Sequence, residues 1–190
     1  NSKDKSSYIK LPEKFETIQN NLGKSLLSNT RRKIKKLQKI GNLKLKIIDH
    51  EKANSEDLEK IFTFIFKEKG KRFLKTGYKN TFLKEELRNF YSKMPKKISS
   101  YARVHLSILT LDNKIIAAHW GVVEQKNFYW ILPAFSDDWL WFSPGRLIMY
   151  YLIEWSIYNK LDKFDLTIGD ENYKNEWSDK KEKLYNLNFS

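Results

Sequence analysis

At the centre of the sequence stands Asn127-Phe-Tyr-Trp-Ile-Leu-Pro-Ala-Phe135, an apolar and aromatic run without a charged residue. Such a run predicts a strand that is buried on both faces of a sheet. A short polar loop follows over residues 136–141, and then comes Phe142-Ser-Pro-Gly-Arg-Leu147. Ser143 is a good N-cap and Pro144 a good first helical residue, so a helix is predicted from there to about Lys160. Apolar residues lie on most sides of this helix, which indicates that it is largely buried.

The turn between this strand and this helix is a candidate anion site. Unpaired backbone N–H groups and the helix dipole both favour negative charge at a helix N-terminus. Gly145 would let a ligand approach the backbone, and Arg146 adds a fixed cation. The alternative is an ordinary capped helix, which spacing alone favours because Ser-Pro-Gly is a common helix opening.

The composition predicts a globular protein with a basic surface. The chain has 190 residues, of which 41% are hydrophobic and 15% aromatic, enough for a sizeable core. No apolar run approaches the roughly 20 residues that span a bilayer, and the N-terminus has no signal-peptide pattern. The net charge of +13 favours anionic partners such as CoA, nucleotides or nucleic acid, although a solvated basic surface also explains it. The absence of cysteine excludes disulfides and is compatible with the cytoplasmic location that we predict.

The N-terminal residues predict a basic helical arm over 1–41, ahead of a main domain over 42–190. Residues 1–11 are expected to be irregular, and a helix is predicted from about residue 24 to Gly41, a natural C′ residue. Two interpretations of its polar face remain open. The charges complement the helix dipole and are solvated, or they hold tRNA or another polyanion. The cations proposed for the second interpretation are Arg31, Arg32, Lys35 and Lys36.

The remaining elements follow from periodicity and turn signals. We predict a strand at Asn42–Asp49, a helix capped by Asn54 or Ser55, a basic loop at Lys67–Lys79 and a helix at about Thr81–Tyr91, which Pro95 ends. Strands at Val104–Leu111 and Ile115–Glu124, joined by a tight turn at Asp112-Asn113, form an antiparallel meander with the central strand. A right-handed crossover makes the next strand, Lys163–Gly169, parallel to the central one. A short helix over 170–179 and a closing strand over Leu184–Phe189 complete the chain.

This order of elements resembles the GNAT acyltransferase fold, an α/β (α+β) class with a mixed, mostly antiparallel sheet flanked by helices. The local sequence resembles the CelD/BioF-like branch of GNAT acetyltransferases over about residues 24–180. The segments that carry the resemblance are Thr30–Gly41, Ile115–Gly121, Phe142–Leu147, Phe164–Asp170 and Tyr173–Trp177. The last of these also resembles the aromatic-Lys-x-x-aromatic element of Fem transferases, which move amino acids from aminoacyl-tRNA to peptidoglycan precursors.

The resemblance implies that acetyl-CoA, or a similar acyl-CoA, is the co-substrate. Of the usual glycine-rich GNAT loop, only Gly145 is clear in this sequence. The implied contacts with the pyrophosphate are Ser143, Gly145, Arg146 and Leu147. Those implied along the pantetheine arm are Tyr129, Ile131, Leu132, Pro133 and Ala134.

Acyl transfer also needs a base, a held thioester and donors for an oxyanion. His119 is the candidate base because its pKa is naturally near neutral, and the alternative is a hydrogen-bonded core histidine. Asp165 lies in an apolar strand and either orients His119 or a substrate amine, or is a buried partner of an arginine or of the backbone. Following the Fem resemblance, Lys174 could stabilise an oxyanion or a phosphate, and otherwise lies on the surface. His50 and His105 are interpreted as structural. Substrate contacts are expected from Asp170, Glu171 and Tyr173, after the strand end.

The sequence offers no pattern for a metal site, because it has three scattered histidines and no cysteine. We therefore predict an N- or O-acetyltransferase that acts on an amine or hydroxyl, on a small-molecule or glycan acceptor that is sugar or cell-envelope linked. Two alternatives stay open: a Fem-like aminoacyl-tRNA-dependent transferase, and a non-catalytic nucleic-acid-binding module.

Overall fold

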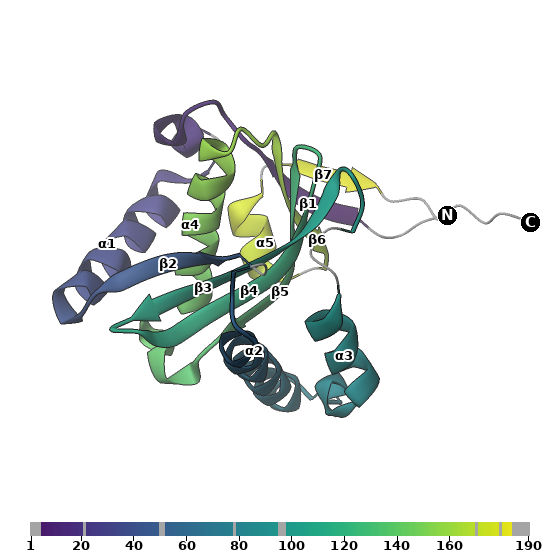
Figure 1. Cartoon of the computed structure of the whole chain (residues 1–190). Helices are drawn as coiled ribbons and strands as arrows, with labels where there is room; N and C mark the ends of the chain where they lie inside the picture. Colours follow the sequence, from purple (N-terminus) through teal and green to yellow (C-terminus); the bar gives the residue numbers. More distant parts are fainter. Residues whose placement is uncertain are drawn as a thin grey trace, which may run out of the picture.

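A seven-stranded sheet runs through the protein, with helices on both of its faces (Figure 1). The structure is a computed structural model, and it describes residues 5–20, 22–49, 52–77, 79–94, 98–169, 171–178 and 180–183. His50, Pro95 and Asp170 lie outside these residues, as does the closing strand predicted over Leu184–Phe189.

The strand order across the sheet is β2-β3-β4-β5-β6-β1-β7. Among the strands that the structure describes, only β5 and β6 pair in parallel, and every other neighbouring pair is antiparallel. This mixed, mostly antiparallel sheet confirms the predicted fold class and the predicted parallel pairing of β6 with the central strand. The strands are β1 (Lys5–Lys10), β2 (Leu43–Ile48), β3 (Ala102–Leu111), β4 (Lys114–Glu124), β5 (Asn127–Phe135), β6 (Lys163–Ile168) and β7 (Lys180–Lys183).

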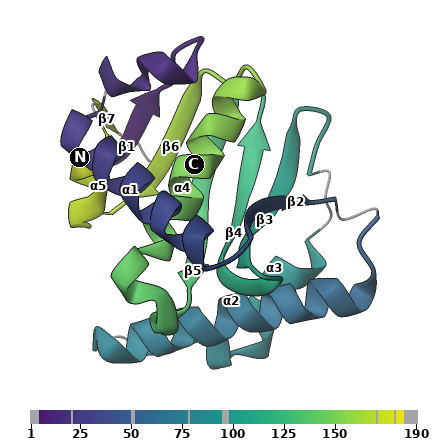
Figure 2. The same cartoon turned by 90° about the vertical axis from the view of Figure 1, so that its left-hand side faces the viewer.

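The helices form two layers, one on each face of the sheet (Figures 1 and 2). Helices α1 and α4 cover one face together with α5, and their apolar side chains share a core with β5 and β6. Helices α2 and α3 cover the other face and form a second core. The α-helices are α1 (Lys24–Ile40), α2 (Ser55–Lys75), α3 (Glu85–Lys93), α4 (Pro144–Tyr158) and α5 (Asn172–Trp177). Short 3-10 helices are η1 (Phe15–Asn20), η2 (Thr81–Leu83) and η3 (Asp137–Phe142).

Strand β5 contains a bulge that explains why its sequence is apolar throughout. Trp120 pairs with Leu132 and Val122 with Tyr129, so two residues of β5 lie opposite Gly121 alone. A bulge of this kind moves the following side chains to the other face of the strand. Side chains before the bulge accordingly join the α4 core, whereas Leu132 and those in phase with it join the α2 core.

The expectation of an irregular N-terminus over residues 1–11 was wrong. Residues 5–10 form β1, which inserts between β6 and β7. The sequence did not indicate this strand because it is short and because polar residues, Ser6 and Ser7, take buried positions in it. Helix α1 packs against α4 through a buried stripe that includes Leu27, Ile34 and Leu37. The predicted division of the chain into an arm and a main domain at residue 41 stays a prediction.

The basic loop predicted over Lys67–Lys79 was also wrong, because α2 continues to Lys75. Asn54 caps this helix as expected, accepting a hydrogen bond of 2.7 Å from the backbone N–H of Asp57. The helix passes through Gly70, whose missing side chain accommodates Asn80; a Cβ at Gly70 would lie 2.5 Å from the Asn80 side chain. The last turns of α2 reach the region where β5 and β6 separate.

Candidate functional site

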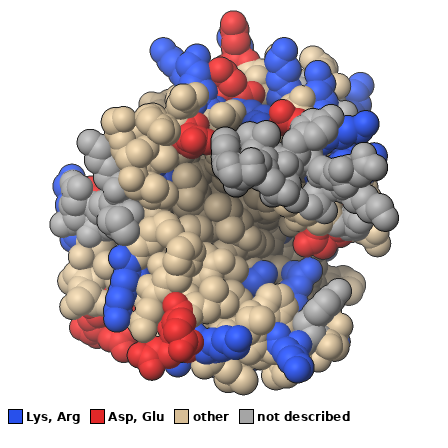
Figure 3. Space-filling model, turned by 90° about the vertical axis from the view of Figure 1, so that its right-hand side faces the viewer, with Lys and Arg blue, Asp and Glu red and all other residues tan. Residues whose placement is uncertain are grey.

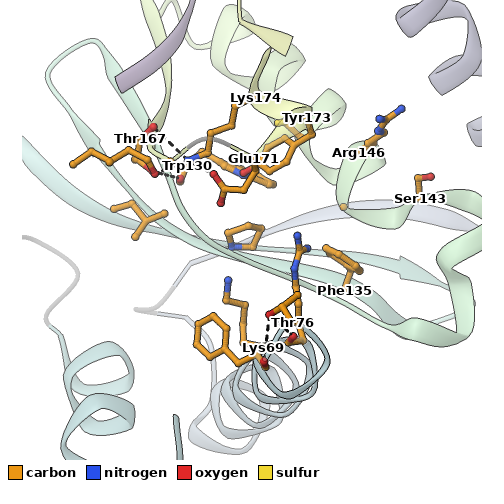
Figure 4. Close-up of a pocket in the computed structure, with 18 of the residues that line it drawn as sticks. Lys69, Thr76, Trp130, Phe135, Ser143, Arg146, Thr167, Glu171, Tyr173 and Lys174 are labelled. Carbon is orange, nitrogen blue, oxygen red and sulfur yellow. Dashed lines mark hydrogen bonds and ion pairs between the residues drawn. The ribbon is translucent and has the colours of Figure 1, made fainter. Parts of the chain in front are cut away.

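A cleft of about 800 Å³ opens between β5 and β6 and is closed below by α2 (Figure 4). Figure 3 shows the molecule from the right-hand side of Figure 1, where a hollow has uncharged atoms at its centre and charged side chains around it. Six elements or their ends supply the walls of the cleft. They are α2 with Lys69, Arg72, Phe73 and Thr76; β5 with Trp130, Ile131, Pro133 and Phe135; η3 with Leu140; α4 with Ser143, Gly145, Arg146 and Met149; β6 with Thr167, Ile168 and Gly169; and α5 with Glu171, Tyr173 and Lys174 at its start.

The cleft exists because two parallel strands pair over a short length only. Pairing of β5 with β6 begins at Asn127 and Lys163 and ends at Tyr129 and Asp165. Beyond that point the two strands diverge, and backbone groups on the facing edges are released from the sheet ladder. Parallel strands that separate in this way leave room for an extended ligand between them.

The end of β6 is held in an unusual backbone conformation. Thr167 has φ of 63°, a left-handed value that is rare for a β-branched residue. Its N–H donates to the Asp165 carboxylate at 2.8 Å, and its hydroxyl donates to the Trp130 carbonyl at 3.3 Å. The first bond lies within β6, and the second bridges β6 to β5 at the mouth of the cleft.

Lys174 lies at the same edge and is 3% exposed. Its ammonium donates to the carbonyl oxygens of Thr167 and Ile168 at 3.3 and 2.6 Å. The ammonium also pairs with the Glu171 carboxylate at 3.0 Å. Burial has the largest single effect on the pKa of Glu171 and raises it, but the contact with Lys174 helps to bring the net pKa below its usual value. Gly169 has φ of 140°, and a Cβ there would lie 2.1 Å from the Glu171 carboxylate. The interpretation of Lys174 as a surface lysine is therefore wrong.

The N-terminus of α4 forms the far end of the cleft. Ser143 is the N-cap residue, but it adopts a left-handed conformation and its side chain caps no backbone N–H. Its hydroxyl instead accepts a hydrogen bond of 2.6 Å from Lys33 of α1, whose pKa is lowered by burial, by Arg146 and by Arg32. The Arg146 guanidinium pairs with Glu176 and points away from Lys69 and Glu171 in Figure 4.

Few backbone donors remain free at this helix start. Pro144 has no N–H, and the N–H groups of Arg146 and Leu147 both donate to the Ser143 carbonyl, at 2.9 and 3.2 Å. Gly145 is packed against Phe135, because a Cβ at this glycine would lie 2.8 Å from the ring. The Phe135 ring therefore already occupies the space that the missing side chain of Gly145 leaves open.

The wall formed by α2 contributes two cations. Lys69 lies 5.3 Å from the centre of the Phe73 ring, and Arg72 lies 5.1 Å from the centre of the Phe135 ring. Burial lowers the pKa of Lys69 to about 8, with further lowering from the positive charges of Arg72 and Lys174 and opposition from Glu171. Neither residue was predicted to lie at the site, because both fall in the segment that was expected to be a loop. The signal that could have found them is Phe73, which lies seven residues after Phe66 and so stays in helical phase with Ile61, Phe62 and Ile65 across the charged stretch.

A neutral phenol stands on the opposite wall. Burial raises the pKa of Tyr173 to about 12, and the negative charge of Glu171 adds to the shift. Tyr173 is therefore protonated at neutral pH, so it can donate a proton but cannot serve as a base.

His119 does not reach the cleft. The side chain is 0% exposed and stacks on Trp130 with ring centres 4.3 Å apart. Its Nε2 accepts a hydrogen bond of 3.3 Å from the Ile131 N–H, which the β5 bulge has released from the ladder. Burial, with a smaller effect of His105, lowers the pKa of His119 well below its usual value. The position fits the alternative interpretation, a hydrogen-bonded core histidine, and does not fit a base that must contact the acceptor.

Asp165 also lies outside the cleft, buried between β6 and β1. It accepts hydrogen bonds from the Ser6 hydroxyl and the Thr167 N–H and lies 3.2 Å from the Lys163 ammonium. The backbone partner that one interpretation predicted is thus present, whereas neither His119 nor an arginine contacts Asp165. The carboxylate joins the N-terminal strand to the sheet.

The structure brings eight of the predicted site residues together at the cleft. They are Ile131, Pro133, Ser143, Gly145, Arg146, Glu171, Tyr173 and Lys174. Four others do not line it. Leu132 and Ala134 are in the α2 core, Leu147 is in the α4 core, and the Tyr129 hydroxyl donates to Glu124 at 3.1 Å. Asp170 lies outside the described residues.

The described part of the chain contains no group of three or more His, Cys, Asp or Glu side chains that could hold a metal ion. Among the helices that the structure describes, none combines the length and apolar character needed to cross a bilayer.

Three solved structures share this fold. FemX matches with a TM-score of 0.61 and 10% identity over 93% of this chain and 60% of its own. The C-terminal domain of an Agrobacterium fabrum protein described as a lysylphosphatidylglycerol synthetase matches with a TM-score of 0.56 and 14% identity, over 92% and 49%. A Bacteroides thetaiotaomicron protein of unknown function gives 0.56 and 14%, over 93% and 56%. The chain thus spans about half to three-fifths of the length of these relatives.

No curated protein sequence matches the chain significantly. A sequence profile of the acetyltransferase (GNAT) domain matches residues 24–175, which is most of the chain and includes α1, the whole β3–β5 meander, the α4 N-terminus and the start of α5. The divergence of β5 from β6 beside a helix N-terminus agrees with this match. The chain therefore belongs to the GNAT acetyltransferase domain family.

Proposed function

We propose that this domain transfers an acetyl or similar acyl group from acyl-CoA to an amine or hydroxyl acceptor, which is sugar or cell-envelope linked. One observation carries the proposal: β5 and β6 separate after Tyr129 and Asp165, and the cleft between them ends at the N-terminus of α4. This geometry suits a long ligand with a negatively charged end, since the helix dipole and nearby cations attract the phosphates. Such a ligand is acyl-CoA.

In this proposal the pyrophosphate lies beside Gly145, whose N–H is the free donor of the first helical turn in the part of the chain that the structure describes. Lys33 and Arg146 supply positive charge there, one from α1 and one from α4. The pantetheine arm runs along Ile131 and Pro133 on the exposed edge of β5. The predicted contacts at Tyr129, Leu132, Ala134 and Leu147 drop out, since these side chains do not line the cleft.

In this proposal the residues at the start of α5 carry out the acyl transfer. The acceptor nitrogen or oxygen attacks the thioester carbonyl and gives its proton to Glu171, an ionised carboxylate that lines the cleft. The tetrahedral intermediate collapses, the carbon–sulfur bond breaks, and the CoA thiolate takes a proton from the neutral Tyr173 phenol. Lys174 keeps this edge rigid and contributes positive charge toward the developing oxyanion.

A Fem-like, aminoacyl-tRNA-dependent transfer is the second candidate. Two observations favour it: the buried Lys174 within its aromatic-Lys-x-x-aromatic element, and the exposed cations of α1 at Arg31, Arg32, Lys35 and Lys36. The fold similarity to FemX agrees with it, although at 10% identity that similarity concerns the fold alone. Under this candidate tRNA would contact α1 and its charged acyl group would enter the same cleft.

Calorimetric titration with acetyl-CoA, CoA and bulk tRNA, at low and moderate salt, separates the two. We expect acetyl-CoA to bind with an affinity that moderate salt weakens only slightly, because the pantetheine arm makes uncharged contacts. Binding of tRNA alone, with steep salt dependence, would instead favour the Fem-like transfer. If that tRNA binding disappears on neutralising Arg31, Arg32, Lys35 and Lys36 and no acyl transfer is found, the chain is a non-catalytic nucleic-acid-binding module.

A further inference from the structure

Two cations of α2 project into the cleft without forming an ion pair with any residue that the structure describes. Lys69 and Arg72 are three residues apart, so they lie on the same side of the helix, and both line the cleft. Figure 4 shows the Lys69 side chain rising from α2 into the open space below Glu171. Their positive ends lie over the rings of Phe73 and Phe135. Among the described residues neither side chain has an ion pair or hydrogen bond, and both interact with Glu171 only at longer range.

The other cations near the cleft are already engaged. Lys174 pairs with Glu171 and donates to two carbonyl oxygens. Arg146 pairs with Glu176, and Lys33 donates to Ser143. Within the described part of the cleft, Lys69 and Arg72 are therefore the cations left for a ligand.

An unpaired cation in a partly buried, aromatic cleft is costly, because burial removes water that no counter-charge replaces. The groups facing Lys69 are Arg72 on its own helix, and Glu171 and Lys174 across the cleft. Glu171 is the one acid among these groups, and its charge is shared with Lys174. Burial is the main cause of the lowered pKa of Lys69, and the positive charges of Arg72 and Lys174 add to it.

The position of Phe135 separates these cations from the helix end that we assign to acyl-CoA. Its ring contacts Gly145, and Arg72 lies over the same ring at 5.1 Å. One side of the cleft therefore contains the α4 N-terminus, and the other contains Lys69 and Arg72. An anion bound at α2 would lie apart from the pyrophosphate, on the side where an acceptor can approach.

We propose that Lys69 and Arg72 bind a carboxylate or phosphate group of the acceptor, so that the domain acylates anionic acceptors. This inference rests on the proposed function, because it takes acyl-CoA to occupy the β5–α4 side. Arg72 offers a planar fork that matches either anion with two hydrogen bonds, and Lys69 adds a point charge. Both groups fix the acceptor relative to Glu171.

Lysine-selective NMR of the protein saturated with acetyl-CoA tests the inference. The probes are succinate and inorganic phosphate, each compared with sodium chloride at equal ionic strength. We expect the Lys69 ammonium signal to shift saturably with at least one probe, and its pKa to rise by about one unit, because a bound anion favours the charged form. The stronger of the two probes identifies the anion as carboxylate or phosphate. A response equal to that of sodium chloride would overturn the inference.

Variants then test which residues form the site. Arg72→Gln should weaken binding of the active probe by about tenfold, because the bidentate contact is lost. Lys67→Gln, an equal charge change at an exposed position of the same helix, should leave binding unchanged. Equal effects of the two variants would overturn the inference in favour of general electrostatic attraction.

Acetyl-CoA affinity separates this inference from the proposed function. In the Lys69→Gln/Arg72→Gln variant it should change by less than about threefold, since these side chains lie beyond Phe135. A larger loss would place both cations in the acyl-CoA site and overturn the inference. If the unaltered protein binds no acetyl-CoA, the proposed function fails. A saturable Lys69 response of the free protein would then still support an anion site at α2, and its absence would overturn both.

Discussion

The ammonium group of Lys174 donates a hydrogen bond of 2.6 Å to the carbonyl oxygen of Ile168, the last residue of β6. The same group donates to the Thr167 carbonyl at 3.3 Å and contacts the Glu171 carboxylate at 3.0 Å. A lysine ammonium has three donors, and these three acceptors use all of them. Lys174 therefore fixes the end of β6 to the start of α5 and so determines one edge of the cleft.

The first prediction is that Lys174→Met lowers the free energy of unfolding by about 2 kcal/mol, because two carbonyl groups and Glu171 lose their donor. Urea denaturation measures the change. Lys36→Met, at an exposed position of α1, is the control and should change it by less than about 0.5 kcal/mol. Equal values for the two variants would mean that the Lys174 contacts contribute nothing to stability.

Gly145 provides the second prediction. Replacing it with Ala places a Cβ 2.8 Å from the Phe135 ring, which must then move. We expect a loss of about 1–3 kcal/mol in stability from this overpacking, and at least a tenfold loss in acetyl-CoA affinity because the ring and helix end shift together. Thermal denaturation and calorimetry measure the two effects.

Gly23→Ala is the matched control, because nothing lies within 4 Å of a Cβ at that position. A bulkier residue at 145 should abolish acyl-CoA binding while the protein still folds. Unchanged acetyl-CoA affinity in both Gly145 variants would remove this helix end from the site.

The third prediction concerns pH and Lys69. Burial and nearby positive charge lower its pKa from 10.5 to about 8, so the folded state disfavours the charged form. The resulting destabilisation is complete below about pH 8 and disappears as pH rises toward 10.5, where the unfolded state also loses the proton. Lys69→Met should therefore be more stable than the unaltered protein at pH 7, by up to about 3 kcal/mol.

Urea denaturation across this pH range gives the test. The advantage of Lys69→Met should shrink steadily above pH 8, whereas Lys67→Met should show no such trend. A constant advantage would show that the variant acts through packing, not through the charge of Lys69.

The fourth prediction is that acid destabilises the protein through His119. Burial and His105 lower the pKa of its imidazole well below 6.5, so the unfolded state takes up a proton first as pH falls. Stability that is present above pH 6.5 is then lost below it, by about 1.4 kcal/mol for each pH unit. His119→Gln, which retains an acceptor for the Ile131 N–H, should lose less stability over the same range.

Activity provides a second measurement on the same variant. Because His119 is fully buried and outside the cleft, the pH dependence of acyl transfer by His119→Gln should keep its ascending limb. Disappearance of that limb would restore His119 as the base and contradict the position described above.

The fifth prediction concerns the attachment of β1. Asp165→Asn should lower the free energy of unfolding by about 2–3 kcal/mol, because the buried carboxylate loses its ion pair with Lys163 and part of its hydrogen bonding to Ser6 and Thr167. Amide exchange should accelerate most in β1 and at Thr167. Asp162→Asn, which breaks an exposed ion pair with Lys126, is the control. Uniform acceleration throughout the sheet would argue against a local role for Asp165.

Local signals in the sequence were sufficient for the elements between Asn42 and Lys160 with strong periodicity. The meander, the tight turn at Asp112-Asn113 with its positive φ values, and the buried helix after Pro144 were all predicted and are confirmed. The parallel strand β6 followed from the handedness of crossovers, which depends on strand twist and not on particular residues. These features depend on neighbours in the chain, so the sequence contains them directly.

Other features depended on contacts between distant residues. Strand β1 is short and polar, and it became a strand because β6 and β7 supply partners on both sides. The basic end of α2 was interpreted as a loop because its cations interrupt the apolar pattern, whereas in the fold they face the cleft. No local pattern distinguishes a lysine in solvent from one beside a ligand site.

The sequence by itself determined the order of the main elements from α1 to α5, the family and the residues at the α4 and α5 ends of the cleft, since these follow from short-range patterns. Only the tertiary structure decided which polar groups meet there. The β5 bulge directed His119 into the core, and the divergence of β5 from β6 brought Lys69 and Arg72 opposite Glu171. The physical reason is that burial and charge pairing depend on distances in space, and residues about 100 positions apart acquire those distances only when the sheet forms.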